Sequence, residues 1–231
     1  MKSLGSSYRA LVIGSTGTIG EAFVQALQQD PHCAGVATLS RSSHPGFSLE
    51  SESSMAEAAA SLQGCSPFDL IIDATGALTI DGQGPEKHIG ALNAERLKRA
   101  YEVNAIGPAL LLKHFSPLLN TRRSIYAKLS ARVGSISDNQ KGGWYGYRAS
   151  KAALNMLLQT AAIEIHRKRP EAIIAAMQPG TVASPLSKPF VSGHATITPP
   201  ESALGLLHAL DGLTPRQGAH FVDFKGNEIS W

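Results

Sequence analysis

A glycine-rich loop between an apolar run and a helical pattern limits most strongly how this chain can fold. Residues 10–13 (ALVI) are apolar, GSTGTIG follows at positions 14–20, and EAFVQALQQ continues with helical spacing. Glycines let the backbone turn sharply and approach a pyrophosphate, whose charge is stabilised by the free N–H groups at a helix N-terminus. The pattern predicts a dinucleotide phosphate loop, and a strand–helix turn without a ligand is the alternative.

The rest of the chain repeats the alternation of buried strands and helices. Strands are expected at 34–39, 69–73, 124–129, 172–177 and 219–224, with a short one at 47–49; helices are expected at 53–62, about 93–119, from 147 onwards and at 201–210. This alternation predicts one α/β Rossmann domain over residues 1–231, with a doubly wound, mostly parallel sheet and helices on both faces. The carboxyl ends of the strands, at Gly14, Arg41, Gly76, Ser130 and Pro179, should share the edge where a ligand binds.

Composition excludes several classes of function. The 231 residues carry a formal charge of only +3 and no Lys/Arg block, so we expect no nucleic-acid partner. Residues 1–9 lack an apolar core and no run approaches about 20 apolar residues, so neither a signal peptide nor a membrane span is expected. Cys33 and Cys65 are isolated, which favours buried thiols in the cytoplasm. The eight histidines lack metal-binding spacing, and no metal site is expected.

The end of the second expected strand carries a cofactor signal. Ser40 and Arg41 stand where a dinucleotide fold places the group that reads the adenosine ribose. An acidic side chain there would accept a hydrogen bond from a free 2′-hydroxyl, whereas an arginine pairs with a 2′-phosphate. The sequence therefore predicts NADP(H) in preference to NAD(H); a solvated loop charge is the alternative interpretation of Arg41.

A tyrosine and a lysine four residues apart supply the candidate chemistry. Tyr147 and Lys151 should lie on one helix face, one turn apart. A nearby ammonium favours the phenolate and lowers a tyrosine pKa that is about 10 in water, which suits proton transfer near neutral pH. The spacing by itself is also compatible with an ordinary surface contact.

Two further polar residues have alternative interpretations. Asp73 ends a buried strand and serves either as an acid or base or, more often at such a position, as a structural carboxylate. Asn104 precedes Gly107 and Pro108 in the long helix, where proline should kink the preceding turn and free carbonyl groups. The amide is then a candidate for a functional contact, the alternative being polar surface.

Six motifs in this order are similar to those of one known family. They are GSTGTIG at 14–20, DATG at 73–76, VNAIGP at 103–108, SARVGS at 130–135, YRASK at 147–151 and QPGTV at 178–182. Together they make the chain resemble the short-chain dehydrogenase/reductase family over almost its whole length. The ending FVDFKGNEISW and the segment GGWYGYRASKAALN are similar to the carbonyl-reductase-like and C-factor-like branch.

The resemblance implies roles for individual residues. Tyr147 would be the catalytic acid/base, Lys151 would lower its pKa and hold the nicotinamide ribose, and Asn104 would anchor a water in a proton relay. The cofactor would contact the phosphate loop, one adenosine-side strand end and the nicotinamide side, which are Gly14, Ser15, Thr16, Gly17, Thr18, Ile19 and Gly20; Ala74, Thr75 and Gly76; and Pro179, Gly180 and Val182. The implied reaction is reversible hydride transfer between NADP(H) and a carbonyl/alcohol pair.

The chain departs from the family pattern at three places. Thr18 replaces the middle glycine of the phosphate loop, with a glycine one place earlier, and Asp73-Ala74 replaces a pair of asparagines. Ala131 stands where the family has the serine that orients the carbonyl. Ser130 is the substitute that we expect, Ser135 is a second choice, and a site without such a serine is the third.

The sequence leaves two classes of function open. The leading expectation is a reductase of a small carbonyl compound, and the alternative is an NADP(H)-binding regulatory or signalling protein with weak or no turnover, which Ala131 favours. A segment at about 183–199, with apolar Leu186, Phe190 and Val191, is expected to cover the substrate. The apolar faces of the helices that carry Asn104 and Tyr147 suggest a homodimer or homotetramer.

Overall fold

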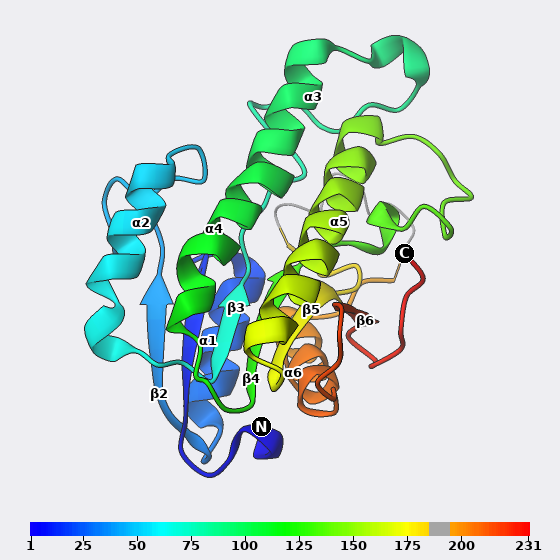
Figure 1. Cartoon of the computed structure of the whole chain (residues 1–231). Helices are drawn as coiled ribbons and strands as arrows, with labels where there is room; N and C mark the ends of the chain where they lie inside the picture. Colours follow the sequence, from blue (N-terminus) through cyan, green and yellow to red (C-terminus); the bar gives the residue numbers. More distant parts are fainter. Residues whose placement is uncertain (185–194) are drawn as a thin grey trace.

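One parallel sheet forms the centre of the molecule. The computed structural model describes residues 1–184 and 195–231. Within them six strands pair in the order β2-β1-β3-β4-β5-β6, and every pair is parallel (Figure 1). The strands are β1 (Tyr8–Ile13), β2 (Cys33–Leu39), β3 (Leu70–Asp73), β4 (Ser124–Leu129), β5 (Ala172–Gln178) and β6 (His220–Asp223).

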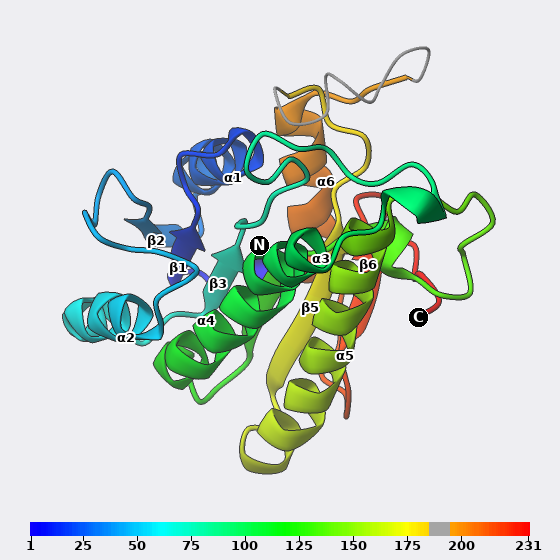
Figure 2. The ribbon, with the colours of Figure 1, turned by 90° about the horizontal axis from the view of Figure 1, so that it is seen from above.

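Helices cover both faces of this sheet, as Figure 2 shows from above. On one side lie α1 (Thr18–Gln29) and α6 (Pro199–Asp211), and on the other lie α2 (Glu52–Ser61), α3 (Ala94–Tyr101), α4 (Gly107–Phe115) and α5 (Tyr145–Lys168). Alternate strand residues point to opposite faces, so Val12 and Ile72 pack towards α1 and α6 while Ile13 and Ile71 pack towards α2, α4 and α5. Both faces are therefore buried, which is why the strands are almost wholly apolar.

The predicted doubly wound fold is confirmed, including the shared edge at the strands' carboxyl ends. The strand order reverses between β1 and β3, which is where open α/β sheets bind ligands. Two expectations were wrong. Residues 47–49 form no strand, because Phe47 is buried as part of an irregular connection, and neither thiol is buried, since Cys33 is half-buried and Cys65 is exposed.

The long helix predicted at about 93–119 has a different kink from the one expected. Asn93 caps its N-terminus, and α3 and α4 are joined by a π-helical turn over Glu102–Ile106. Pro108 lies in the first turn of α4, where a missing N–H costs little. The extra residue of the π turn, rather than a proline-broken hydrogen bond, holds Asn104 at the inner side of the helix.

No helix among the described residues is long and apolar enough to cross a bilayer. The same residues contain no group of three or more His, Cys, Asp or Glu side chains placed to hold a metal ion.

Gly20 allows α1 to start directly against the strand that precedes it. A Cβ atom at this position would lie 2.1 Å from the Gly14 carbonyl oxygen and 3.2 Å from the Ser15 Cα. These neighbours are backbone atoms, so a side chain can be accommodated only if the loop moves away from the helix.

We expect Gly20→Ala to destabilise the protein by about 1–3 kcal/mol through overpacking and to weaken dinucleotide binding through the displaced loop. Urea unfolding and a fluorescence titration with NADPH measure the two effects. Gly35→Ala is the matched control, because a Cβ at that position meets no atom within 4 Å. Equal stability of the two variants would contradict this account of the loop.

Candidate functional site

The glycine-rich loop lies at the carboxyl edge of β1 and fits a phosphate group. Gly14 has a φ of 80°, and a Cβ there would press on the backbone of Ala74 and Thr75 at 3.2 Å. The loop is thus held against the end of β3. Gly17 is the N-cap of α1 and no side chain caps this end, so the helix presents free N–H groups to the same edge.

The other loop residues complete this cradle. Ser15, Thr16 and Thr18 have no side-chain hydrogen-bond partner among the described residues, and Ile19 lines a cavity beside Tyr147. Three uncommitted hydroxyl groups beside an uncapped helix end match the hydrogen-bond acceptors of a pyrophosphate. The loop therefore fits a dinucleotide despite its altered glycine spacing.

Arg41 is exposed just beyond the end of β2, at the same edge. Its neighbour Ser40 is buried and closes a tight turn, because Ser40 and Ser43 exchange hydrogen bonds between backbone and hydroxyl groups. In the described part of the chain no carboxylate pairs with Arg41. The guanidinium is available to an anionic ligand at this end of the edge.

A buried ion pair lies beneath the site. Lys128 lies in β4, one of the two central strands of the sheet. Its Nζ is 2.9 Å from Asp73 Oδ1, and both side chains are fully inaccessible to solvent. The same ammonium donates to the Thr75 carbonyl oxygen at 2.6 Å and to the Thr75 hydroxyl at 2.9 Å. Thr75 in turn donates its N–H and its hydroxyl to Asp73. Asp73 is therefore a structural carboxylate, the alternative that the sequence favoured.

Asn104 and Lys151 meet at the end of the neighbouring strand β3. The Asn104 amide accepts from the Ala77 N–H at 2.9 Å and donates to the Ala77 carbonyl at 2.8 Å. A Cβ on Gly76 would lie 3.1 Å from Asn104 Oδ1 and 3.4 Å from Lys151 Nζ. The side chain of Asn104 thus holds the Ala77 backbone, and the water-anchoring role implied by the resemblance stays a prediction.

Lys151 and Tyr147 project from the first turns of α5 into this region. Lys151 Nζ donates to the Leu129 carbonyl at 3.2 Å and lies 5.7 Å from the centre of the Tyr147 ring. Burial, with a smaller contribution from the charge of Lys128, lowers the pKa of Lys151 to about 7. Burial raises the pKa of Tyr147 to about 12, opposite to the shift expected from a neighbouring lysine. In the free protein the phenol is therefore a neutral proton donor at pH 7.

Neither serine proposed from the sequence presents a free hydroxyl proton to Tyr147. Ser130 is buried and donates to Asn155 Oδ1 at 2.6 Å, across to α5. Ser135 Oγ accepts from the Asp138 N–H and approaches Ser137 Oγ, which commits it to its own turn. Ala131 has no hydroxyl. Ser130 lines the larger cavity, and its role as the carbonyl-orienting donor stays a prediction.

Pro179, Gly180 and Val182 follow β5 on the opposite side of the edge. Gly180 has a φ of 80° and packs closely on Ile197 and Phe224, and Val182 forms a bridge with Ile197. The expected substrate-covering segment 183–199 lies largely, with Leu186, Phe190 and Val191, outside the described residues.

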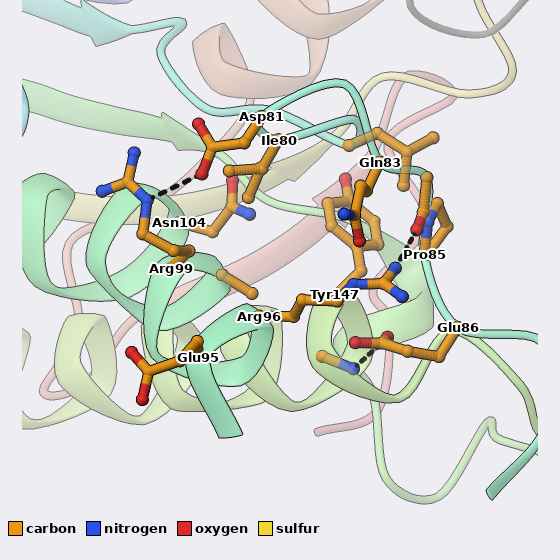
Figure 3. A pocket seen from close by; sticks show the side chains of 14 residues that line it. Ile80, Asp81, Gln83, Pro85, Glu86, Glu95, Arg96, Arg99, Asn104 and Tyr147 are labelled. Atoms are coloured by element: carbon orange, nitrogen blue, oxygen red, sulfur yellow. Dashed lines mark hydrogen bonds and ion pairs between the residues drawn. The ribbon is translucent and has the colours of Figure 1, made fainter. Parts of the chain in front are cut away.

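Two cavities flank Tyr147. The larger, about 530 Å³, runs from Ile19 and Pro179–Val182 to residues 130–133 and Trp144. The smaller, about 150 Å³, lies between the 78–86 loop and α3 and is shown in Figure 3. Leu78 and Tyr147 line both cavities, so they form the wall between them. The larger one is lined by Ile19 of the phosphate loop and by Tyr147, so it connects the two parts of the site that a nicotinamide and its substrate require.

Comparison with known proteins identifies the family. The family model described as short chain dehydrogenase matches residues 44–194. The chain belongs to the short-chain dehydrogenase/reductase family. It is 32% identical over 190 residues to 1-hydroxy-2-glutathionyl-2-methyl-3-butene dehydrogenase from Rhodococcus sp. (strain AD45), covering 81% of this chain and 79% of that protein.

Other relatives agree with the branch suggested by the sequence. C-signal from Myxococcus xanthus is 32% identical over 169 residues, covering 71% of this chain and 93% of the relative. The crystal structure of NADPH-bound carbonyl reductase from chicken fatty liver superposes with a TM-score of 0.81 at 23% identity, covering 97% of this chain and 94% of that one. The last likeness establishes the shared fold.

Sequence reasoning missed two residues that shape this short-chain dehydrogenase/reductase site. Lys128 interrupts the apolar run SIYAKL, which is a signal for a buried charge that needs a partner. Glu86 comes from the 77–90 loop, is buried, and accepts the N–H of Gly146 at 2.9 Å in the first turn of α5 (Figure 3). No local sequence pattern predicts that contact, because Glu86 and Gly146 are 60 positions apart in the sequence.

We expect Lys128→Met to destabilise the protein by about 3–5 kcal/mol, because Asp73 would keep a buried charge without its partner. Urea unfolding measures the loss. Adding Asp73→Asn to the same chain should recover a large part of it, since the uncompensated charge is then removed. Lys113→Met is the control: its pairing with Glu52 is exposed and should leave the midpoint nearly unchanged. If Lys128→Met alone were as stable as Lys113→Met, the result would contradict the role given to the Lys128–Asp73 pair.

Proposed function

We propose that the chain is an NADP(H)-dependent oxidoreductase that reduces a small carbonyl compound, with Tyr147 as the acid. The observation that carries the proposal is the neutral, half-buried phenol that lines the larger cavity, one helical turn from Lys151. The Rhodococcus relative, named as a dehydrogenase of a hydroxy compound, supports chemistry at an alcohol or carbonyl.

Each residue contributes a definable step. When bound, NADPH supplies the hydride that goes to the carbonyl carbon. Tyr147 donates its hydroxyl proton to the carbonyl oxygen, and the phenolate that remains is stabilised by protonated Lys151. Because a pKa of about 7 leaves Lys151 partly protonated near neutrality, the formation of the phenolate and the protonation of Lys151 favour each other. Lys151 is itself oriented by the Leu129 carbonyl.

An NADP(H)-binding regulatory protein with little turnover is the second candidate. Ala131 and the engagement of Ser130 with Asn155 favour it, because Ala131 has no hydroxyl and the Ser130 hydroxyl donates its proton to Asn155 Oδ1. Loss of one such donor costs about 2.7–4 kcal/mol of transition-state stabilisation, which slows an enzyme greatly without abolishing its activity. The two candidates share the cofactor site and differ only in turnover.

Tyr147→Phe separates the candidates. We expect it to lower kcat for NADPH-dependent reduction by roughly 10²–10⁴-fold, the usual contribution of general acid catalysis, while NADPH still binds. Absorbance of NADPH with a panel of aldehydes, ketones and quinones measures the rate. Tyr145→Phe is the matched control, because Tyr145 lies two residues earlier and lines neither cavity. Tight cofactor binding without turnover in the wild type would favour the regulatory candidate.

Arg41→Ala tests the cofactor preference. Removing a charge-assisted pair with the 2′-phosphate should weaken NADPH binding by roughly tenfold or more and leave NADH binding almost unchanged. Fluorescence titrations with both cofactors measure this difference. Arg122→Ala, an exposed arginine beside the opposite edge of the sheet before β4, controls for the change in net charge. Equal losses for NADPH and NADH would remove the support for a phosphate contact at Arg41.

A further inference from the structure

The described charged residues that line the larger cavity beside Tyr147 are all cationic. Among its described lining residues are three cationic side chains, Arg132, Lys141 and Arg148, and none that is acidic. Residues 185–194, which lie outside the description, contain no Asp or Glu and so cannot supply a carboxylate. Because the net charge of the chain is only +3, this is a local property and not a generally basic surface.

The neighbouring cavity provides a contrast. Asp81, Glu86 and Glu95 line it together with Arg96 and Arg99, and Arg99 pairs with Asp81 in Figure 3. Its charges are therefore largely compensated within the protein. The two sides of Tyr147 differ in the charge that they offer to a ligand.

The three cations of the larger cavity differ in how far they are neutralised. Arg132 pairs with Asp138 at 3.4 Å and Asp223 at 3.2 Å. Arg148 instead donates Nε to the Gly143 carbonyl at 2.9 Å and Nη1 to the Val133 carbonyl at 3.3 Å. Its Nη2 donates to no atom of the described residues. Carbonyl oxygens orient the guanidinium without cancelling its charge.

Lys141 is exposed at the mouth of the cavity and forms no ion pair within residues 1–184 and 195–231. Of the phosphate loop, only Ile19 lines this cavity, so Lys141 and Arg148 do not belong to the part of the site that fits a pyrophosphate. Lys141 lies on the segment that leads into α5, and Arg148 lies in the first turn of α5, one residue after Tyr147. One guanidinium oriented by carbonyl groups and one exposed ammonium in the same lining match a small anionic group.

Apolar and aromatic side chains line the same cavity. Leu78 and Val133 contribute aliphatic surface, and the Trp144 ring stands edge-on to the Tyr147 ring with centroids 6.1 Å apart. An apolar, flat body therefore fits between the acid and the cations.

We propose that the carbonyl substrate carries a carboxylate, which Lys141 and Arg148 bind while the carbonyl group lies at Tyr147. This inference rests on the proposed reductase function and adds the chemical class of its substrate. Electrostatic attraction of this kind raises association and specificity and weakens with ionic strength.

Two substrates that differ only by a carboxylate test the inference. Reduction of 4-carboxybenzaldehyde and of benzaldehyde by NADPH is compared through kcat/KM at 20 mM and 500 mM NaCl. We expect the carboxylated aldehyde to be preferred by roughly tenfold or more at low salt, with the preference shrinking at high salt. Lys141→Gln should reduce this preference at least about threefold, whereas Lys168→Gln, which removes an exposed charge from the far end of α5, should preserve it.

A preference of one or below, or a preference that Lys141→Gln leaves intact, would overturn the inference while leaving the reductase function standing. Absence of turnover with both aldehydes would count against the reductase function, and calorimetry then decides the inference separately. Titration of the NADP-loaded protein compares 4-(hydroxymethyl)benzoate with benzyl alcohol. Tighter binding of the carboxylate that Lys141→Gln weakens would support the inference, and equal or undetectable binding of both would overturn it.

Discussion

The arrangement of the site depends on a buried ammonium that must be compensated. Lys128 is removed from water in the middle of the sheet, and a charge in that position is tolerated only with a paired carboxylate and filled hydrogen bonds. Asp73 and both oxygens of Thr75 supply them, which binds the end of β4 to the end of β3. Gly76 follows at once, and its backbone is enclosed by Asn104 and Lys151. The strand ends, the π turn and the start of α5 thereby share one set of contacts.

Much of this fold could be predicted because parallel strands buried on both faces have continuous apolar sequences. The expected strand 124–129 coincides with β4, and the other five differ by a few residues at their ends. The strand predicted at 47–49 was wrong because Phe47 is buried without pairing in the sheet. The π turn could not be predicted, since Gly107 and Pro108 suggest a break by proline and no sequence rule marks an extra residue in a helical turn.

Side-chain partners were less predictable than strand ends. The approach of Tyr147 to Lys151 follows from helical spacing, and the shared edge follows from the parallel sheet. Ser130 was chosen for its place beside Ala131, but its proton goes to Asn155, which lies 25 residues away in the chain. The predicted direction of the Tyr147 pKa was wrong in the free protein, because burial raises this pKa and the pKa of Lys151 is itself lowered. Both features depend on packing between segments that are distant in the sequence.

The capping of α5 by Glu86 ties the tyrosine to a loop far from it in sequence. Trp144, the residue before the helix, has a left-handed conformation and offers no side-chain cap, so the Glu86 carboxylate satisfies the amide of Gly146, next to Tyr147. If the 77–90 loop swung outwards, that amide would lose its acceptor and the carboxylate its donor. The loop and Tyr147 are therefore linked through one hydrogen bond, and both contribute residues to the smaller cavity, so a displacement of the loop would change the shape of that cavity.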